Sequence, residues 1–475
     1  MAMNIRNKKL ITLLFFAPLL AVAQSKKPNI VIILADDLGW GDVGFHGSDI
    51  HTPHLDQLAR EGVVLNHYYT APVCSPTRAG LMTGRYPNRF GLRETVVPPW
   101  SAFGVDTAET FLSDYLARAG YENRAVLGKW HLGHATRAYL PLQRGFTHFY
   151  GHYNGAIDYF THQREGELDW HRNEETSYDE GYSTDLISDE AVRCITDYAS
   201  ADSPFFLYVA YNAPHGPLQA KEEDLRRYGY DETKPVFGGA NDSGYGHVGR
   251  GNTRDQTYKA MVTSMDNGIG RILATLKALG IEDNTLVLFH SDNGAAPGEG
   301  GSSGKLRGTK FQEWDGGVRS PAVIKWPDGF QGGRSVDQVT GYIDAVPTIL
   351  EITGQSRKTA KPLDGISILP VLQQNRRPID RDFYLGYGAL ISGNRWKIVK
   401  ANSGNPRMEE PADVLYDVLA DPTESHDVKA QHKRHYRRLS KQVARYDAIT
   451  ADVTVPPYGD GRRGFVAPKN WKITD

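Results

Sequence analysis

Acidic, amide and basic side chains follow four short apolar runs of this sequence. They are Asp36 and Asp37 after residues 29–34, Lys129 and His131 after 124–127, His215 after 205–210, and Asp292 and Asn293 after 285–289. Carboxylate and amide oxygens can hold a hard metal ion, whereas lysine and histidine can bind an anion or transfer a proton. A single polar residue after a strand is ordinarily the start of a loop. Here all four apolar runs are followed by side chains that could bind a metal or an anion or transfer a proton, which predicts a functional site.

The segment around Cys74 is a fifth candidate for chemistry. Pro76 suits the first turn of a helix, residues 77–82 have helical composition, and Gly84 can end the helix. Cys74 is therefore expected at a helix N-terminus, where the dipole and the free N–H groups favour an anion. Arg78, one turn further on, can point back to the same place.

The apolar runs and the segments between them predict the elements that must position these residues. Continuous apolar runs are typical of strands buried on both faces of a sheet. Helical patterns separate them, for example at 107–119 and 258–279. Alternating strands and helices predict an α/β fold with a mainly parallel sheet, in which ligands bind beyond the carboxyl ends of the strands.

The N-terminal residues have the pattern of a cleaved export signal. Arg6, Lys8 and Lys9 precede a short apolar stretch, Leu10–Ala23, that ends in Ala-Val-Ala. Residues 1–23 are thus predicted to be a signal peptide, with the mature chain in the periplasm or outside the cell. No cysteine follows the cleavage point, so no lipid or other membrane anchor is expected.

Length, composition and charge limit the number of domains and the class of protein. A length of 475 residues predicts two to three domains, and an apolar content of 40% excludes a disordered chain. The formal net charge is −2, so no basic footprint for nucleic acid is present. The composition changes at residues 373–377, which predicts a boundary between a domain of residues 24–375 and a smaller one of residues 376–475. Strand-like pieces at 383–384 and 396–399 and a basic helical stretch at 429–446 belong to the second.

Two motifs resemble those of a known family. Residues 74–85, Cys-Ser-Pro-Thr-Arg-Ala-Gly-Leu-Met-Thr-Gly-Arg, match the C-x-P-x-R…T-G-R motif of type I, formylglycine-dependent sulfatases, and residues 128–133 match their second motif. Within that family the chain is most similar to the arylsulfatase B (N-acetylgalactosamine-4-sulfatase) branch, through residues 42–48, 52–56 and 217–219. The resemblance implies an alkaline-phosphatase-like fold: a mixed, mostly parallel sheet flanked by helices, with a smaller C-terminal α+β domain of an antiparallel sheet and a helix.

The resemblance implies a modified residue at position 74. In the family a maturation enzyme oxidises the motif cysteine to Cα-formylglycine, an aldehyde that is hydrated in the active enzyme. One hydroxyl of the hydrate attacks sulfur and releases the alcohol; the other loses its proton, the carbonyl re-forms, and sulfate leaves. This assignment of Cys74 excludes a disulfide with Cys194, whose surroundings indicate a small residue buried in a helix.

The resemblance also distributes roles over the other residues. Asp36, Asp37, Asp292, Asn293 and the modified Cys74 are expected to bind a metal, and such hard oxygen donors favour Ca²⁺, or alternatively Mg²⁺, over zinc. Lys129 and Lys310 are expected to bind the sulfate oxygens, Arg78 to position the formylglycine, His131 to assist sulfate elimination, and His215 to protonate the leaving alcohol. How the proton transfers divide among His131, His215 and Lys310 stays open. Asp315 stands where the family usually has glutamate.

The expected function is that of an exported sulfatase acting on a sulfated oligo- or polysaccharide. The arylsulfatase B likeness favours the 4-O-sulfate of galactose or N-acetylgalactosamine, in a carrageenan-type galactan or in chondroitin, and extends to Asp158 and His162, which could line the sugar pocket. Alternatives are a formylglycine-dependent phosphonate or phosphate ester hydrolase, a sulfatase for a 6-O- or 2-O-sulfate, and a catalytically inactive carbohydrate-binding relative. The glycine-rich segment 231–257 either borders the cleft or has no role in it.

Overall fold

The computed structural model of the chain describes residues 27–473, apart from residues 94, 202, 239–245, 247, 357–358, 375–377 and 409. The predicted signal peptide, the middle of the segment 231–257 and most of the predicted boundary at 373–377 lie outside the described residues. Among the helices that the structure does describe, none has both the length and the apolar character needed to cross a bilayer.

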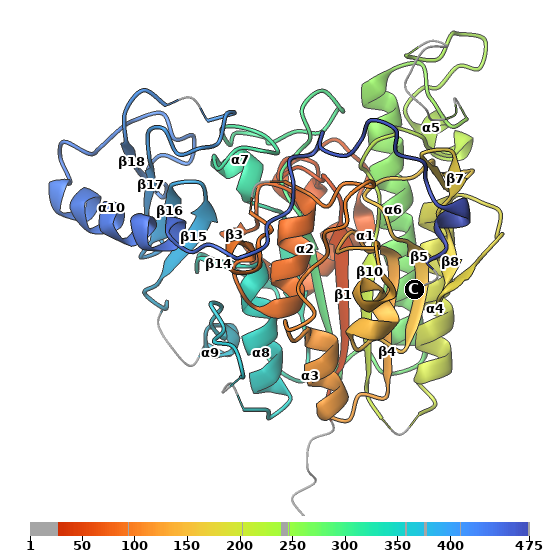
Figure 1. Cartoon of the computed structure of the whole chain (residues 1–475). Helices are drawn as coiled ribbons and strands as arrows, with labels where there is room; N and C mark the ends of the chain where they lie inside the picture. Colours follow the sequence, from red (N-terminus) through yellow and green to blue (C-terminus); the bar gives the residue numbers. More distant parts are fainter. Residues whose placement is uncertain are drawn as a thin grey trace, which may run out of the picture.

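A ten-stranded mixed sheet forms the centre of the molecule (Figure 1). In the order of the sheet its strands are β13 (Arg334–Val336), β2 (Val63–Leu65), β12 (Ala322–Lys325), β11 (Thr285–Ser291), β1 (Asn29–Ala35), β10 (Phe205–Ala210), β4 (Asn123–Lys129), β5 (His148–His152), β8 (His171–Arg172) and β9 (Glu175–Thr176). The five central strands, from β11 to β5, are parallel to one another. In the register, Ala35 lies opposite Ser291 and Leu34 lies opposite Ala210, so the carboxyl ends of these strands meet at one edge.

Helices cover both faces of this sheet because the residues of each central strand are apolar on both sides. In β1, Ile30, Ile32 and Leu34 belong to one buried cluster, and Val31 and Ile33 belong to the other. The first cluster includes side chains of α2 (Cys74–Thr83), α3 (Leu112–Arg118) and α8 (Ala345–Ile352). The second includes side chains of α1 (Pro53–Glu61), α4 (Ser183–Tyr198) and α6 (Arg254–Ala278). The predicted α/β fold is confirmed.

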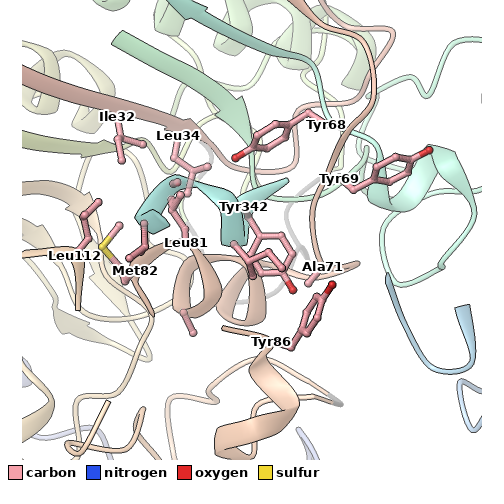
Figure 2. Close-up of a cluster of buried hydrophobic side chains, with 14 of the residues drawn as sticks. Ile32, Leu34, Tyr68, Tyr69, Ala71, Leu81, Met82, Tyr86, Leu112 and Tyr342 are labelled. Carbon is pink, nitrogen blue, oxygen red and sulfur yellow. The ribbon is translucent and has the colours of Figure 1, made fainter. Parts of the chain in front are cut away.

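Helix α2 is wedged between the sheet and a tyrosine. Leu81 and Met82 lie in the same apolar cluster as Ile32 and Leu34 of β1 (Figure 2). A Cβ on Gly80 would come within 2.1 Å of the Tyr342 ring, so only glycine permits this approach. Gly84 then ends the helix in the left-handed conformation, at φ 69°. This close packing fixes the N-terminus of α2, and with it Cys74, at the carboxyl edge of the sheet.

Two predicted helices differ from the observed ones at their starts. The helix predicted from residue 107 begins only at Leu112, because the Asp114 carboxylate accepts the Phe111 N–H at 2.9 Å and caps the helix there. Helix α6 begins earlier than predicted, at Arg254, because the Thr253 hydroxyl accepts the N–H of Gln256.

The shorter elements are β3 (Tyr68–Tyr69), β6 (Gln163–Arg164), β7 (Glu167–Leu168), α5 (Glu222–Arg227), α7 (Asp315–Val318), β14 (Thr340–Gly341) and α9 (Leu369–Leu372).

A smaller antiparallel sheet follows near the C-terminus. Its strands are β15 (Asp382–Gly386), β16 (Ala389–Ser392), β17 (Trp396–Val399) and β18 (Val414–Asp417), and α10 (Lys433–Asp447) packs on them through Leu439 and Val443. After α10 the chain does not stay with this sheet. Residues 448–473 cross in front of α2 to the far edge of the main sheet (dark blue in Figure 1), where buried Trp471 donates to the Arg164 carbonyl oxygen at 2.9 Å.

A buried ion network ties the small sheet to the main domain. Lys397 of β17 lies 2.7 Å from Asp315 Oδ1 and 2.7 Å from Glu424 Oε1, and all three side chains are inaccessible to solvent. The Asp315 N–H also donates to Glu424 Oε2 at 2.7 Å. Removing one partner would leave uncompensated buried charge, which is strongly destabilising. Asp315 therefore joins α7 to β17 and to the loop that follows β18, a structural role that the sequence did not indicate.

Candidate active site

The polar residues that follow the central strands converge at one point because of the strand register. Asp36 and Asp37 follow β1, Lys129 ends β4, and Asp292 follows β11. The side chains are buried, and Lys129 Nζ donates to Asp36 Oδ2. The structure thus brings together the groups that the sequence separates by more than 250 residues.

Cys74 faces a histidine whose orientation is fixed from behind. Cys74 Sγ lies 3.4 Å from His131 Nδ1, and His131 Nε2 lies 3.0 Å from the Val97 carbonyl oxygen. A carbonyl can only accept, so Nε2 carries the proton and Nδ1 presents its lone pair to residue 74. Burial, together with the charges of Lys129 and Arg78, holds the pKa of His131 well below its ordinary value. The ring is neutral and can accept a proton from a group at position 74.

Arg78 is a buried guanidinium that bridges three elements. Its Nε and Nη2 donate to Asp292 Oδ2 at 3.1 and 2.9 Å, and its Nη1 donates to the Lys129 carbonyl oxygen at 3.1 Å. Nη2 also lies 3.4 Å from Asp36 Oδ2. Arg78 therefore fixes α2 relative to β1, β4 and β11 and holds Cys74 beside the carboxylates.

Asp37, Lys310 and His215 form a second group next to Cys74. Lys310 Nζ lies 2.7 Å from Asp37 Oδ1, and His215 Nε2 lies 3.6 Å from Asp37 Oδ2. Burial opposes the charge of Asp37, but Lys310, His215 and Asn293 hold its pKa below the ordinary range. Burial lowers the pKa of His215 to about 4, with Asp37 opposing the shift and Lys310 adding to it. His215 Nδ1 lies 2.6 Å from the Gly216 carbonyl oxygen, so Nε2 is the nitrogen that faces the site.

The carboxylates leave room for a cation. Asp36 Oδ1 and Asn293 Oδ1 are buried oxygens without a hydrogen-bond partner in the part of the chain that the structure describes. Ligand atoms of Asp36, Cys74 and Asp292 lie within 4.8 Å of one another. Burial and the nearby Asp36 raise the pKa of Asp292 to about 6, although the charges of Arg78 and Lys129 oppose this shift. Oxygen donors of this kind fit Ca²⁺ or Mg²⁺.

A cavity of about 400 Å³ opens over these residues. Four of its lining residues are the candidate catalytic groups Cys74, His131, His215 and Lys310. Its remaining walls are made by Thr95, Val96, Val97, Pro99, Gly155, Ala156, Arg164, Phe311, Arg407 and Tyr458. The cavity therefore exposes the reactive residues at its base and draws its rim from segments far apart in the chain.

The two residues predicted to bind sugar lie elsewhere. Asp158 accepts hydrogen bonds at Oδ1 from the N–H groups of Phe160 and Thr161, and at Oδ2 from Gln219 and Gly246. His162 Nε2 lies 3.0 Å from the Gly181 carbonyl oxygen, and its ring stacks on Trp170. Neither side chain is among the described residues that line the cavity; their segment contributes Gly155 and Ala156 instead. The hydrogen bonds of Asp158 join its loop to Gln219 and Gly246, and that of His162 joins the loop to Gly181.

Several residues that shape the site carry no signal in the sequence. Ser75 Oγ donates to the His131 carbonyl oxygen at 2.9 Å and accepts the Val97 N–H at 3.2 Å. It therefore positions both the backbone of His131 and Val97, the residue whose carbonyl contacts the His131 ring. Phe311 adopts φ 76°, and its N–H donates to the Pro72 carbonyl oxygen at 2.8 Å, which aims the preceding Lys310 at Asp37. Backbone carbonyls and loop aromatic residues of this kind cannot be read from motif spacing.

Cys194 and the acid beside it are structural. Both cysteines are free and buried, and Cys194 lies on α4 in the apolar cluster on the other face of the sheet. Neighbouring Glu190 is already bonded by His148 at 2.6 Å, Arg172 at 2.7 Å and Arg193 at 2.6 Å. The prediction that Cys194 is a buried helical residue is confirmed.

The fold and the site together define a class of protein. Acids, lysines and histidines at the carboxyl edge of a doubly covered α/β sheet, beside a cysteine that begins a helix, define a hydrolase of the alkaline-phosphatase-like architecture. The family model described as Sulfatase matches residues 28–355. The chain belongs to the sulfatase family and is a sulfuric ester hydrolase.

Similar proteins span nearly the whole chain. Mouse (Mus musculus) arylsulfatase J is 28% identical over 93% of this chain and 79% of its own length. Mouse N-acetylgalactosamine-6-sulfatase is 33% identical over 81% of this chain and 74% of its own length. The crystal structure of Ps i-CgsB in complex with k-i-k-neocarrahexaose is 32% identical, with a TM-score of 0.78 over 90% of this chain and 94% of that one. A phosphonate monoester hydrolase of Agrobacterium radiobacter, at 23% identity and a TM-score of 0.58, shares the fold.

Proposed function

We propose that this protein is an exported sulfatase that removes sulfate from a saccharide by means of a formylglycine derived from Cys74. The observation that carries the proposal is the placement of Cys74 at the base of a cavity, 3.4 Å from a neutral histidine and beside Lys310. Cys74 forms no disulfide, and the family motif around it is complete from Cys74 to Arg85. Maturation by a formylglycine-generating enzyme is part of this proposal.

Each residue around the cavity has a role in the proposed reaction. His131 Nδ1 accepts a proton from the hydroxyl at position 74, and Lys129 and Lys310 bind the sulfate oxygens. His215 donates a proton from Nε2 to the oxygen of the leaving alcohol when its ring is protonated, a form that neighbouring Asp37 favours, and Lys310 is the next candidate. Overall one S–O bond to the alcohol is broken and one water is consumed, giving the free alcohol and hydrogen sulfate.

A divalent cation completes the site. Asp36, Asp37, Asp292 and Asn293 would hold it, together with residue 74. When bound, it would polarise the sulfate and lower the pKa of the hydroxyl at position 74. The unpartnered oxygens of Asp36 and Asn293 support this role, the oxygen donors support Ca²⁺ or Mg²⁺ over zinc, and the resemblance to sulfatases favours Ca²⁺.

The proposed substrate is a galactose or N-acetylgalactosamine unit that carries a 4-O-sulfate. The similarity to a structure solved with a neocarrahexaose supports a galactan of the carrageenan type. The identity of 33% to an N-acetylgalactosamine-6-sulfatase favours a 6-O-sulfate as the second candidate. No observation favours the phosphonate ester alternative beyond a shared fold.

A panel of defined sugar sulfates tests the substrate. Purified enzyme, with conversion of Cys74 verified by mass spectrometry, is incubated with 2-, 4- and 6-sulfated galactosides, N-acetylgalactosamine 4- and 6-sulfate, and glucosamine 6-sulfate. Sulfate release is expected mainly from the 4-sulfates, because polar groups arranged for an axial sulfate are left unpaired by another isomer. Release mainly from 6-sulfates would overturn the proposed sulfate position. A phosphonate monoester is assayed beside the panel, and hydrolysis of that ester alone would overturn the proposed activity.

The alanine variant of His215 is expected to lose activity in a way that depends on the leaving group. A sugar alcohol leaves poorly without a proton, so His215→Ala should reduce kcat/KM on a sugar sulfate by about 10²- to 10⁴-fold. The loss on nitrophenyl sulfate should be much smaller, because nitrophenolate leaves unaided. His148→Ala, which alters a histidine bonded to Glu190 away from the cavity, serves as the control. Equal losses on both substrates would assign the proton transfer to another group, first Lys310.

A further inference from the structure

The rim of the cavity carries more positive charge than one sulfate needs. Beyond Lys310 at the base, Arg164 and Arg407 line the cavity, and none of its described lining residues is acidic. Lys129 and Lys310 are already assigned to the sulfate that leaves, and Arg78 is ion-paired with Asp292. Of the two rim arginines, Arg164 is ion-paired with Glu165 at 3.5 Å and Arg407 is exposed, and neither has a role in the proposed sulfate chemistry.

Arg407 is held at the rim by contacts to the residue after Lys310. Its guanidinium lies 4.1 Å from the centre of the Phe311 ring, and its carbonyl oxygen accepts a hydrogen bond from Gln312 at 2.9 Å. Asn405 Nδ2 donates to the Phe311 carbonyl oxygen at 2.8 Å. This loop between β17 and β18 is thus pinned to the active-site segment, and stacking on Phe311 leaves the guanidinium edge of exposed Arg407 available for an anion.

Arg164 lines the same cavity and contacts the C-terminal tail. Arg164 Nη2 lies 3.4 Å from the Tyr458 hydroxyl, and its Nε lies 3.5 Å from Glu165 Oε1. Trp100 Nε1 donates to the Tyr458 carbonyl oxygen at 2.9 Å, and the rings of Trp100 and Tyr458 meet edge to face. The tail, which lies beyond the matched family region 28–355, therefore supplies a wall of the cavity.

We propose that Arg164 and Arg407 bind a second anionic group of the saccharide, a sulfate or carboxylate on the sugar next to the one that loses its sulfate. The proposal rests on the proposed sulfatase function and narrows its substrate to multiply charged oligosaccharides. Arginine binds such groups through two parallel N–H···O bonds, which give direction as well as charge. Tyr458, which lines the cavity beside Arg164 and is 41% exposed, offers an aromatic face to the adjoining sugar.

The test compares two oligosaccharides that differ by one anionic group. One carries only the sulfate that the panel above identifies, and the other carries an additional sulfate on the adjoining sugar. The wild-type kcat/KM is expected to be about 5- to 50-fold higher for the doubly sulfated substrate, since a partly exposed charged hydrogen bond contributes modestly. Arg407→Gln and Arg164→Gln should each remove most of this preference, and the preference should weaken with added salt.

Activity on the singly sulfated substrate serves as the internal control for folding. It should stay near the wild-type value in both variants, because the reactive residues are untouched. Arg118→Gln, which removes one charge at the end of α3 away from the cavity, should retain the preference. Equal losses on both substrates, or a wild-type enzyme without any preference, would refute the second anion site. Absence of sulfate release from every substrate would instead refute the proposed function.

Discussion

Replacing Cys74 with alanine or serine is expected to abolish turnover on every sulfate ester. Alanine has no nucleophile, and serine has one hydroxyl, which can accept the sulfuryl group but has no second hydroxyl to expel it. Loss of a covalent nucleophile typically costs about 10⁴-fold or more in kcat. The measurement is sulfate release over many turnovers, with mass spectrometry of the peptide that contains residue 74 to verify its chemical state.

The second cysteine provides the matched control for this substitution. Cys194→Ala removes a thiol that is equally buried but lies in α4 on the other face of the sheet. Its activity is expected to match the wild type, with only the modest loss of stability that follows from a small cavity. Sustained turnover by a Cys74→Ser protein whose serine is unmodified would contradict the aldehyde mechanism.

Removing the carboxylate of Asp292 is expected to eliminate both the metal and the activity. Asp292 accepts two hydrogen bonds from Arg78 and lies within ligand distance of Asp36 and Cys74. Asp292→Ala therefore deletes a proposed ligand and also leaves Arg78 without its main partner. The loss of Lewis-acid and template effects, each of several kcal/mol, predicts a decrease in rate of about 10³-fold or more.

Metal content and stability give readouts that do not depend on turnover. Wild-type protein treated with a strong chelator should lose activity, recover it with Ca²⁺, and gain about 2.7 kcal/mol of stability when Ca²⁺ reaches 100 times its dissociation constant. Asp292→Ala should show neither bound metal nor stabilisation by Ca²⁺. Asp224→Asn, which alters another buried carboxylate on α5, should retain both. Full activity in metal-free wild-type protein would show that the oxygen cluster holds no catalytic ion.

The sequence by itself was sufficient for the central sheet and the family. The runs at 30–34 and 205–210 are apolar at every position, which only a doubly covered strand accommodates, and the observed strands β1 and β10 coincide with them closely. The residues proposed for metal and sulfate binding were also predictable. They follow strand ends, and parallel strands bring their carboxyl ends to the same edge. A local pattern therefore implied a three-dimensional proximity.

Only the tertiary structure decided how the cavity is walled. Asp158 and His162 were predicted from a resemblance in sequence, yet their polar atoms hold their loop to other segments, through Gln219, Gly246 and Gly181. Arg407 and Tyr458 reach the cavity through Phe311 and Trp100, contacts between segments that are about 100 and 360 residues apart. Such contacts depend on loop conformation and on the path of the C-terminal tail, which have no hydrophobic period to reveal them. Strand patterns in the sequence thus predicted the residues at the bottom of the cavity. Long-range packing, which only the structure shows, placed the residues of the rim that meets the substrate.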